Sequence, residues 1–183
     1  MCEEIIVRQC APTLAGIKTG SLFPYPCSSR QEAIADVCSF NRQFLHRGLC
    51  LLPLKFRDTS VLLLLFRPDR LAKDLKDPLA AGILAGCGYS CRSYGEYLAA
   101  LIRRFSECEQ FPHEIGLFIG YPPEDVLGFI QNRALNFKCS GLWKVYGDED
   151  HARCLFQQFR QCTESYCCLW QSGLRLEQLA VNA

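Results

Sequence analysis

Two apolar runs separated by four polar residues restrict the possible folds of this 183-residue chain more than any other feature. Residues 49–56 and 61–66 are almost continuously apolar, and residues 57–60 between them read Arg-Asp-Thr-Ser. Two such runs around a short polar turn predict a β-hairpin. Strands that are apolar at nearly every position have both faces covered. We therefore expect a hairpin buried between layers of helices.

Helical spacing is found on both sides of this hairpin. In residues 30–47 the apolar side chains follow the i, i+3, i+4, i+7 pattern of an amphipathic helix, and Gly48 is placed to end it. Asp69 and Asp148 are suitable residues to cap the helices that follow them. Helices are therefore predicted over residues 11–23, 30–47, 94–108, 123–133 and 149–170. A further helix is predicted to begin at residue 70, to break at Pro78 and to end in the region 82–88.

Two further strands are predicted in the second half of the chain. Residues 115–119 form a short apolar run that ends at Gly120-Tyr121-Pro122, and residues 143–146 form another. A strand–helix–strand unit of this kind is expected to be a right-handed parallel crossover. The prediction is one α+β domain over residues 1–183, with a small mixed sheet of about four strands packed by helices.

The charge balance excludes some partners. Lys plus Arg is 20 and Asp plus Glu is 19, so the formal net charge is +1. A protein that binds nucleic acid or an anionic membrane through bulk charge has a strong basic excess. The longest uninterrupted apolar run has six residues, whereas a membrane-spanning helix needs about 20. We expect no nucleic-acid partner and no membrane partner.

The cysteine content points to a reducing compartment. The chain has 13 cysteines, an odd number, so one thiol would stay unpaired even under oxidising conditions. Its first residues, Met-Cys-Glu-Glu-Ile-Ile, are acidic where a secretory signal has basic residues, and no apolar segment follows. We expect a cytoplasmic protein with mostly reduced thiols, and such a thiol load suits an anaerobic cell.

The common catalytic and phosphate-binding motifs are absent, and so is the C-x-x-C spacing of zinc and redox sites. Cys87 and Cys91 are separated by three residues in a segment rich in Gly and Ser. Both sulfurs could reach one metal ion, so they are weak candidates for metal ligands. The alternative is that they are two loop thiols with no joint role.

A Cys–His pair is a second candidate. Cys10 is predicted to lie just before a helix, where the helix dipole lowers the pKa of a thiol, and His113 is at the head of a predicted strand. This order is similar to that of papain-like hydrolases, although here a Pro-Pro helix start follows the His strand. The alternative is a capped helix and a structural histidine.

The predicted crossover places further candidates at the two edges of the sheet. Cys139 has Lys138 beside it, and His113 and Cys139 each precede a strand, so all three are expected at one edge. Open α/β sheets bind ligands at the opposite edge, beyond the carboxyl ends of the strands. The candidate ligand-binding residues are therefore Tyr121, Asp125, Tyr146 and Gly147 at that opposite edge, together with Lys138 at the first edge. Turn formation and packing are the alternative role for these residues.

Three segments resemble one bacterial family, domain of unknown function 3793. They are residues 10–18 (CAPTLAGIK), 111–122 (FPHEIGLFIGYP) and 138–148 (KCSGLWKVYGD), and the resemblance extends over most of the chain. It implies a cytosolic protein of anaerobic Gram-positive bacteria linked to iron or redox physiology, and no particular activity or cofactor. Many members have a histidine where this chain has Gln9, a difference that weakens a Cys–His pair at Cys10.

Two functions remain open from the sequence. The first is a non-enzymatic module that binds a small ligand, a metal ion or a redox protein partner beside the strand ends. The second is a thiol-dependent hydrolase or transferase that uses Cys139 or Cys10 with His113. We favour the binding module, because no complete catalytic constellation can be assembled.

Overall fold

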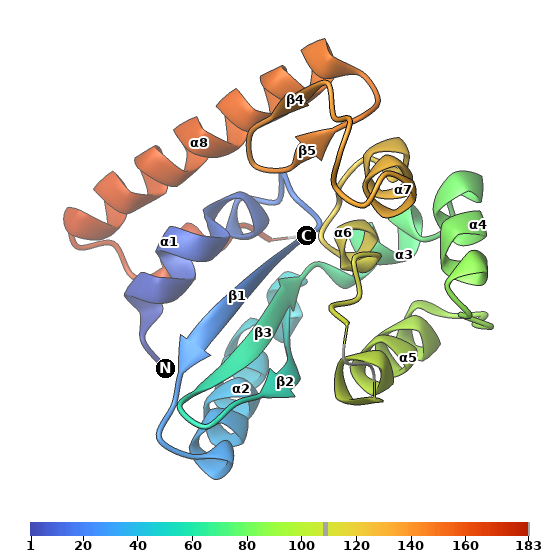
Figure 1. The fold of residues 1–183 in the computed structure, drawn as a ribbon. Coiled ribbons are helices and arrows are strands. Elements are labelled where there is room, and N and C mark those ends of the chain that lie inside the picture. The colour runs from blue at the N-terminus through green and yellow to red at the C-terminus, as the bar shows by residue number, and fades with distance from the viewer. Residues whose placement is uncertain (108–109, 183) are drawn as a thin grey trace.

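Helices pack on both faces of a small antiparallel sheet in the computed structural model, which describes residues 1–107 and 110–182 (Figure 1). The α+β class is confirmed. The helical elements are α1 (Glu3–Leu14), α2 (Arg30–Phe44), η1 (Leu45–Arg47), α3 (Pro68–Asp74), α4 (Pro78–Gly86), α5 (Tyr94–Glu107), α6 (Ile115–Phe118), α7 (Pro123–Gln131), α8 (Glu149–Gln171) and α9 (Leu176–Leu179). The strands are β1 (Gly20–Pro26), β2 (Cys50–Phe56), β3 (Ser60–Phe66), β4 (Cys139–Ser140) and β5 (Lys144–Val145).

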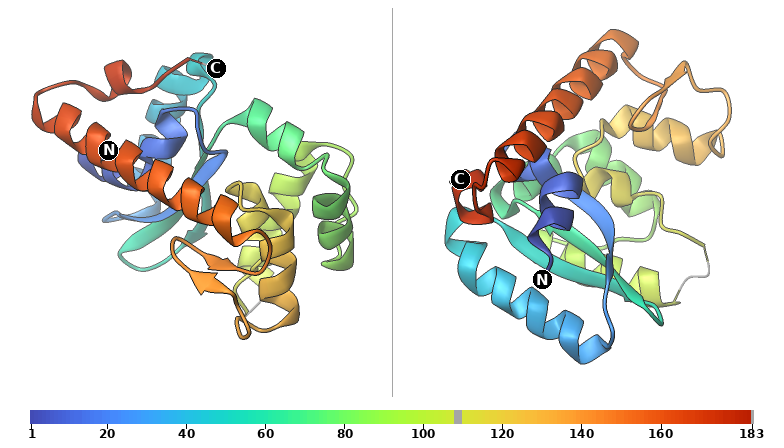
Figure 2. Two further views of the ribbon diagram at one scale, coloured as in Figure 1. Left: turned by 90° about the horizontal axis from the view of Figure 1, so that it is seen from above. Right: turned by 90° about the vertical axis from the view of Figure 1, so that its left-hand side faces the viewer.

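The predicted hairpin is confirmed as β2 and β3, which pair antiparallel. Successive side chains of β3 alternate between two hydrophobic clusters, because neighbouring residues in a strand point to opposite faces. Leu63 and Leu65 pack with α1, α2 and α9, whereas Leu64 and Phe66 pack with α3 to α7. The right-hand view of Figure 2 shows α2 on one side of the sheet and α5 on the other. Both faces are therefore covered, as the continuous apolar runs predicted.

The sheet gains a third strand that the sequence analysis did not predict. β1 pairs antiparallel with β3, which gives the order β1-β3-β2, so the predicted helix over residues 11–23 is wrong in its second half. Helix α1 ends where Gly16 adopts φ +74°, and Ile17 N–H donates to Pro12 O at 3.0 Å. This is a glycine-terminated helix end. Pro24 and Pro26 fit β1 because it is an edge strand.

The predicted strand over residues 115–119 is also wrong, because this segment forms the short helix α6. Gly120 has φ +80°, and Tyr121 N–H donates to Gly116 O at 2.9 Å, which closes the turn as a Schellman motif. The second predicted strand survives as the two-residue β5, whose partner is β4 in a separate antiparallel hairpin. The parallel crossover is therefore absent among the described residues, and with it the argument that placed His113 and Cys139 at one edge.

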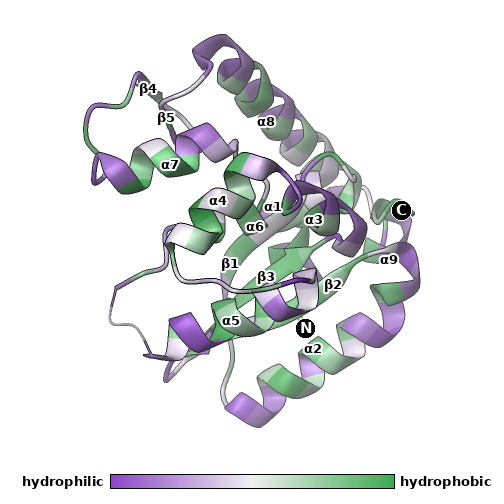
Figure 3. Ribbon diagram, turned by 90° about the vertical axis from the view of Figure 1, so that its right-hand side faces the viewer, coloured by the Kyte–Doolittle hydropathy of each residue, from purple (hydrophilic) through white to green (hydrophobic). Residues whose placement is uncertain are grey.

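The remaining helices lie close to their predicted positions. Asp148 caps α8 through a bond from His151 N–H, and α4 begins at Pro78 with the Asp77 carboxylate as its cap. Helix α3 begins at Pro68, so Asp69 lies inside its first turn and is not the cap. The last residue of the predicted helix 94–108 falls outside the described residues. Figure 3 shows the strands mostly in green, for hydrophobic residues, whereas α2 and α8 carry both hydrophilic and hydrophobic residues along their length. None of the helices in the described ranges is long and apolar enough to cross a membrane.

One buried arginine connects the end of α1 to the sheet and to the C-terminal segment. Arg67 follows β3 and is 3% exposed. Its guanidinium donates to Thr13 O and Leu14 O at 2.7 Å each, and to Val181 O at 3.0 Å. The last turn of a helix leaves its carbonyls without partners inside the helix, and besides Arg67 the Thr13 carbonyl accepts from Gly16 N–H at 3.2 Å and the Leu14 carbonyl from Val181 N–H at 3.1 Å. Arg67 therefore satisfies the C-terminal end of α1 with a positive charge, which the helix dipole favours.

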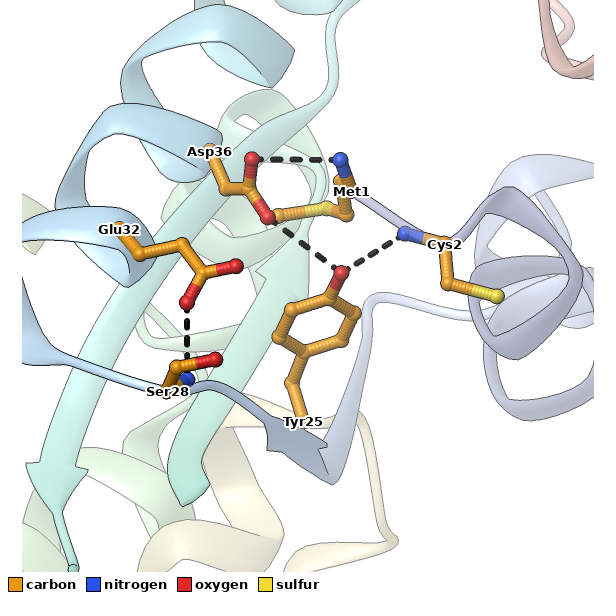
Figure 4. Close-up of polar contacts among 6 residues, drawn as sticks. All are labelled: Met1, Cys2, Tyr25, Ser28, Glu32 and Asp36. Atoms are coloured by element: carbon orange, nitrogen blue, oxygen red, sulfur yellow. Dashed lines mark hydrogen bonds and ion pairs between the residues drawn. The ribbon is translucent and has the colours of Figure 1, made fainter. Parts of the chain in front are cut away.

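A polar cluster connects the beginning of α1 to α2 (Figure 4). Tyr25 Oη accepts from Cys2 N–H at 2.7 Å and donates to Asp36 at 3.3 Å. The amino group of Met1 pairs with the same carboxylate at 3.2 Å. The end of β1 thereby joins both helices that cover one face of the sheet.

The twelve cysteines within the described ranges are free thiols. Hydrophobic packing on both faces of the sheet, rather than cross-linking, therefore holds these parts together. We expect the melting temperature to be the same with and without a reductant under anoxia. A melting temperature that falls sharply when the reductant is added would contradict this prediction.

Candidate functional site

A cleft of about 400 Å³ opens between α6, α7 and the β4–β5 hairpin. Apolar and aromatic side chains make up most of its surface, and a few polar groups lie among them. The cleft is lined by Leu22, Phe111, His113, Ile115, Gly116, Ile119, Tyr121, Asp125, Val126, Phe129, Ser140, Gly141, Leu142, Trp143 and Lys144.

A buried carboxylate fixes the hairpin against α7. Asp125 lies in the first turn of α7 and is 3% exposed. Its Oδ1 accepts from Tyr146 N–H and Gly147 N–H, and its Oδ2 accepts from the indole N–H of Trp143, all at 2.7 Å. Hydrogen bonds to a charged group are among the strongest in proteins. Asp125 therefore organises the wall of the cleft, and its charge is already satisfied by three donors.

The loop between α7 and β4 supports the hairpin from the other side. Arg133, Ala134 and Asn136 have φ values of +49°, +63° and +57°, which non-glycine residues seldom adopt. Carbonyl groups in this loop accept from the hairpin: Lys144 Nζ donates to Ala134 O at 2.7 Å and Tyr146 Oη donates to Leu135 O at 3.0 Å. These bonds hold the loop in its unusual conformation.

Two glycines permit close packing at the cleft. A Cβ at Gly116 would lie 2.8 Å from Val126 Cγ2, and a Cβ at Gly128 would overlap the ring of Tyr146. Both helices that form the floor and side of the cleft therefore depend on glycine for their approach to neighbouring elements.

Aromatic rings line two sides of the cleft. Tyr121 stacks on Trp143 with the ring centroids 4.6 Å apart. His113, which is exposed, packs between Phe129 at 4.9 Å and Phe111 at 5.7 Å. Stacked and tilted rings at these separations attract one another beyond the area that they bury.

The segment that carries His113 is anchored by its neighbour. Glu114 is 3% exposed and accepts from Arg104 Nε at 2.6 Å and from Tyr89 Oη at 3.1 Å. The carboxylate thus joins α5 to the start of α6. His113 is therefore held at the mouth of the cleft by a buried ion pair directly beside it.

The structure separates His113 from Cys139. Cys139 pairs with Val145 across the β4–β5 hairpin, and both side chains pack toward α8. Ser140 pairs with Lys144, and these two line the cleft that contains His113. Directly opposed residues of an antiparallel pair lie on the same face, and the next pair lies on the other face. Cys139 and His113 therefore face different sides of the hairpin.

The electrostatics of the thiols differ from the sequence-based expectation. Partial desolvation raises the pKa of Cys139, and the nearby Glu149 carboxylate raises it further. Lys138, the cation beside Cys139 in the sequence, donates to Gly147 O at 2.6 Å. Cys10 lies inside α1 rather than before a helix, and complete burial raises its pKa. Both thiols are thus shifted away from the reactive thiolate form.

Cys87 is the residue that ends α4, and Cys91 lies in the loop after it. Both pack against the hydrophobic cluster between the sheet and α3 to α7. Desolvation raises the pKa of both thiols. Within residues 1–107 and 110–182, no three His, Cys, Asp or Glu side chains come together to hold a metal ion. The metal-ligand role of these two cysteines stays a prediction.

The five predicted ligand-binding residues do gather around one hairpin, although the reason given for them was wrong. Tyr121 and Asp125 line the cleft, and the hydrogen bonds of Lys138, Tyr146 and Gly147 hold its wall. Their role in binding stays a prediction. The sequence analysis did not single out the aromatic lining of the cleft or Ser140 and Lys144 at its mouth. Nothing local distinguishes these side chains, because the chain brings them together only through tertiary contacts.

One comparison identifies the family. The model of the family described as "Protein of unknown function (DUF3793)" matches residues 6–180 of the 183. The chain belongs to this family. No curated protein and no solved structure matches the chain. DUF3793 membership thus confirms the resemblance, while the link to iron or redox physiology stays a prediction.

Proposed function

We propose that this DUF3793 protein binds a small, mainly apolar molecule in the cleft between α6, α7 and the β4–β5 hairpin. The single observation that carries this proposal is the lining of the cleft. Its volume of about 400 Å³ lies in the range of small-molecule sites, and apolar side chains predominate. His113, Ser140 and Lys144 supply a few polar groups at the mouth, which is the usual composition of a ligand pocket.

The same groups indicate the polarity of the ligand. Asp125, the acidic residue of the lining, is occupied by three donors, whereas Lys144 and the imidazole of His113 add positive charge or donors. An acceptor or a negative charge on the ligand is therefore favoured at the mouth. The apolar part of the ligand would lie deeper, against Phe129 and the backbone at Gly116.

The walls support binding because they are fixed before any ligand arrives. The three bonds to Asp125 and the bonds from Lys144 and Tyr146 to the loop after α7 constrain the hairpin. A site organised in advance loses less conformational entropy when it binds. A thiol-dependent enzyme has less support, because the pKa of both candidate thiols is raised and Cys139 faces away from His113.

The cleft can be tested with 8-anilinonaphthalene-1-sulfonate, an apolar probe with a negative charge. We expect saturable binding of one probe molecule, with a rise in its fluorescence. Ser140→Trp places a large side chain at the exposed mouth of the cleft and is expected to weaken binding by about tenfold or more, or roughly 1.4 kcal/mol. Isothermal titration gives the stoichiometry and the affinity.

Ser39→Trp is the matched control, because Ser39 is exposed on α2, on the other side of the sheet. It adds the same indole and is expected to leave the affinity unchanged. Equal affinity of Ser140→Trp and the unsubstituted protein, with both proteins folded, would overturn the assignment of the cleft as a binding site.

A further inference from the structure

A second cleft, also of about 400 Å³, lies between α1 and α8. Tyr121 and Leu142 line both clefts, so they form the partition between them. The second cleft differs in character, because Arg8, Lys18 and Arg160 contribute to its walls and Glu164 is the acidic residue among them. None of its basic residues has a role in the function proposed above.

Lys18 lies at the wall of this cleft in an unusual environment. Its ammonium group is 5.3 Å from the ring centroid of Tyr121 and 5.9 Å from that of Phe159. Both rings also line the cleft, which places the amine at its surface. In the part of the chain that the structure describes, no carboxylate forms an ion pair with Lys18. Lys18 is half-buried, and an ammonium ion that is partly removed from water without an acidic partner is destabilised.

The two ring faces attract the ammonium form, whereas burial favours the neutral amine, and burial is the larger effect. Burial lowers the pKa of Lys18 to about 8. At neutral pH such an amine has roughly a few hundred times more of its unprotonated form than an ordinary lysine. The unprotonated amine is the nucleophilic form, and desolvation is one way in which proteins activate lysine.

Charged side chains from α1 and α8 surround the opening of this second cleft. Arg8 on α1 and Arg160 on α8 are exposed at the rim, and Arg8 also pairs with Glu4 one turn away at 2.8 Å. Glu164 on α8 is the opposing charge. Tyr121 and Cys10 stay neutral, because burial raises the pKa of both. Two guanidinium groups at the rim favour a carboxylate or a phosphate there.

We propose that Lys18 is a carbonyl-reactive amine that binds a small anionic aldehyde or ketone as an imine. The lone pair of the neutral Nζ attacks the carbonyl carbon, a C–N bond forms, and the carbonyl oxygen takes up a proton. Loss of one water molecule, which removes that oxygen and two protons, leaves the C=N bond. Amine and carbonyl compound thus give imine and water without an oxidant or a reductant. The anionic group of the compound lies at the arginine rim.

Pyridoxal 5′-phosphate, a phosphate-bearing aldehyde, is a suitable probe. The full chain is incubated with it, the imine is reduced with borohydride, and labelled lysines are identified by peptide mapping. The chain has six lysines, so the other five serve as internal controls. Lys18 is expected to be labelled about tenfold or more faster than Lys144, whose ammonium group donates to Ala134 O. The rate at Lys18 is expected to rise with a midpoint near pH 8, as its pKa of about 8 requires.

Two variants test the parts of the site separately. Lys18→Met is expected to abolish the selective label, and Lys73→Met, which removes an exposed lysine on α3, to leave it in place. Arg160→Gln is expected to slow labelling by pyridoxal 5′-phosphate but not by pyridoxal, which has no phosphate. Labelling of Lys18 at the rate of the other lysines, or with the pH profile of an ordinary lysine, would overturn the proposal. This measurement on the unsubstituted protein is decisive even if Lys18→Met does not fold.

Discussion

Replacement of Phe118 by Ala is expected to lower the free energy of unfolding by about 3–5 kcal/mol. The side chain is 0% exposed and belongs to the cluster that packs α3 to α7 on the sheet. Its ring lies 6.2 Å from that of Tyr89, and its carbonyl would lie 2.9 Å from a Cβ at Gly20. Because the ring is fully buried, its removal leaves a cavity that the surrounding residues fill only in part. Chemical denaturation measures the loss.

Phe137→Ala is the matched control for this substitution. Phe137 is 40% exposed, and its ring contacts the ammonium group of Lys144 at 4.7 Å. Its loss is expected to cost below about 1 kcal/mol, because an exposed ring gains little from burial and cation–π contacts at the surface are weak. Similar losses for the two variants would mean that α6 does not lie in the core.

The hairpin was predictable because its signal is local. Both strands are apolar, the turn between them is polar, and the runs 49–56 and 61–66 are each short for a helix. The long helices were predictable for a similar reason, since periodicity and caps such as Asp148 lie within one segment of the chain.

Helix α6 and strand β1 were not predicted correctly because short apolar segments are ambiguous. The five residues 115–119, Ile-Gly-Leu-Phe-Ile, are followed by Gly-Tyr-Pro and fit a buried strand or a single helical turn. Gly16 and Gly120 were sequence signals for helix ends, because glycine is the usual residue just after a helix. In the structure both glycines adopt positive φ at that place. The remaining choice depends on tertiary packing: β1 forms because β3 offers it a free edge.

The candidate site was only partly predictable, since its contacts join distant parts of the chain. Asp125 lies 18 residues from Trp143 and 21 from Tyr146 along the sequence. Such bonds leave no periodic pattern. Lys18 fell within the predicted helix over residues 11–23 and was given no role, and only the fold brings Phe159 of α8 and Tyr121 beside it.

Replacement of Arg67 by Met is expected to destabilise the protein by about 3–5 kcal/mol. Methionine keeps most of the apolar stem but removes every donor. The two bonds at 2.7 Å, to Thr13 O and Leu14 O, join a charged donor to a helix end, and bonds of this type contribute about 1.5–3 kcal/mol each. The third bond, to Val181 O, fixes the C-terminal segment beside α1. We therefore expect faster hydrogen exchange at Val181, whose N–H donates to Leu14 O at 3.1 Å.

Two further variants separate the geometry of Arg67 from its charge. Arg67→Lys keeps the positive charge but lacks the planar fork that reaches several carbonyls at once, so it is expected to recover only part of the lost stability. Arg70→Met removes an exposed arginine on α3 and is expected to change the free energy of unfolding by less than about 0.5 kcal/mol. Equal stability of Arg67→Met and Arg70→Met would show that the hydrogen bonds from Arg67 to the end of α1 do not stabilise the protein. Full recovery with lysine would assign the effect to charge at the helix terminus alone.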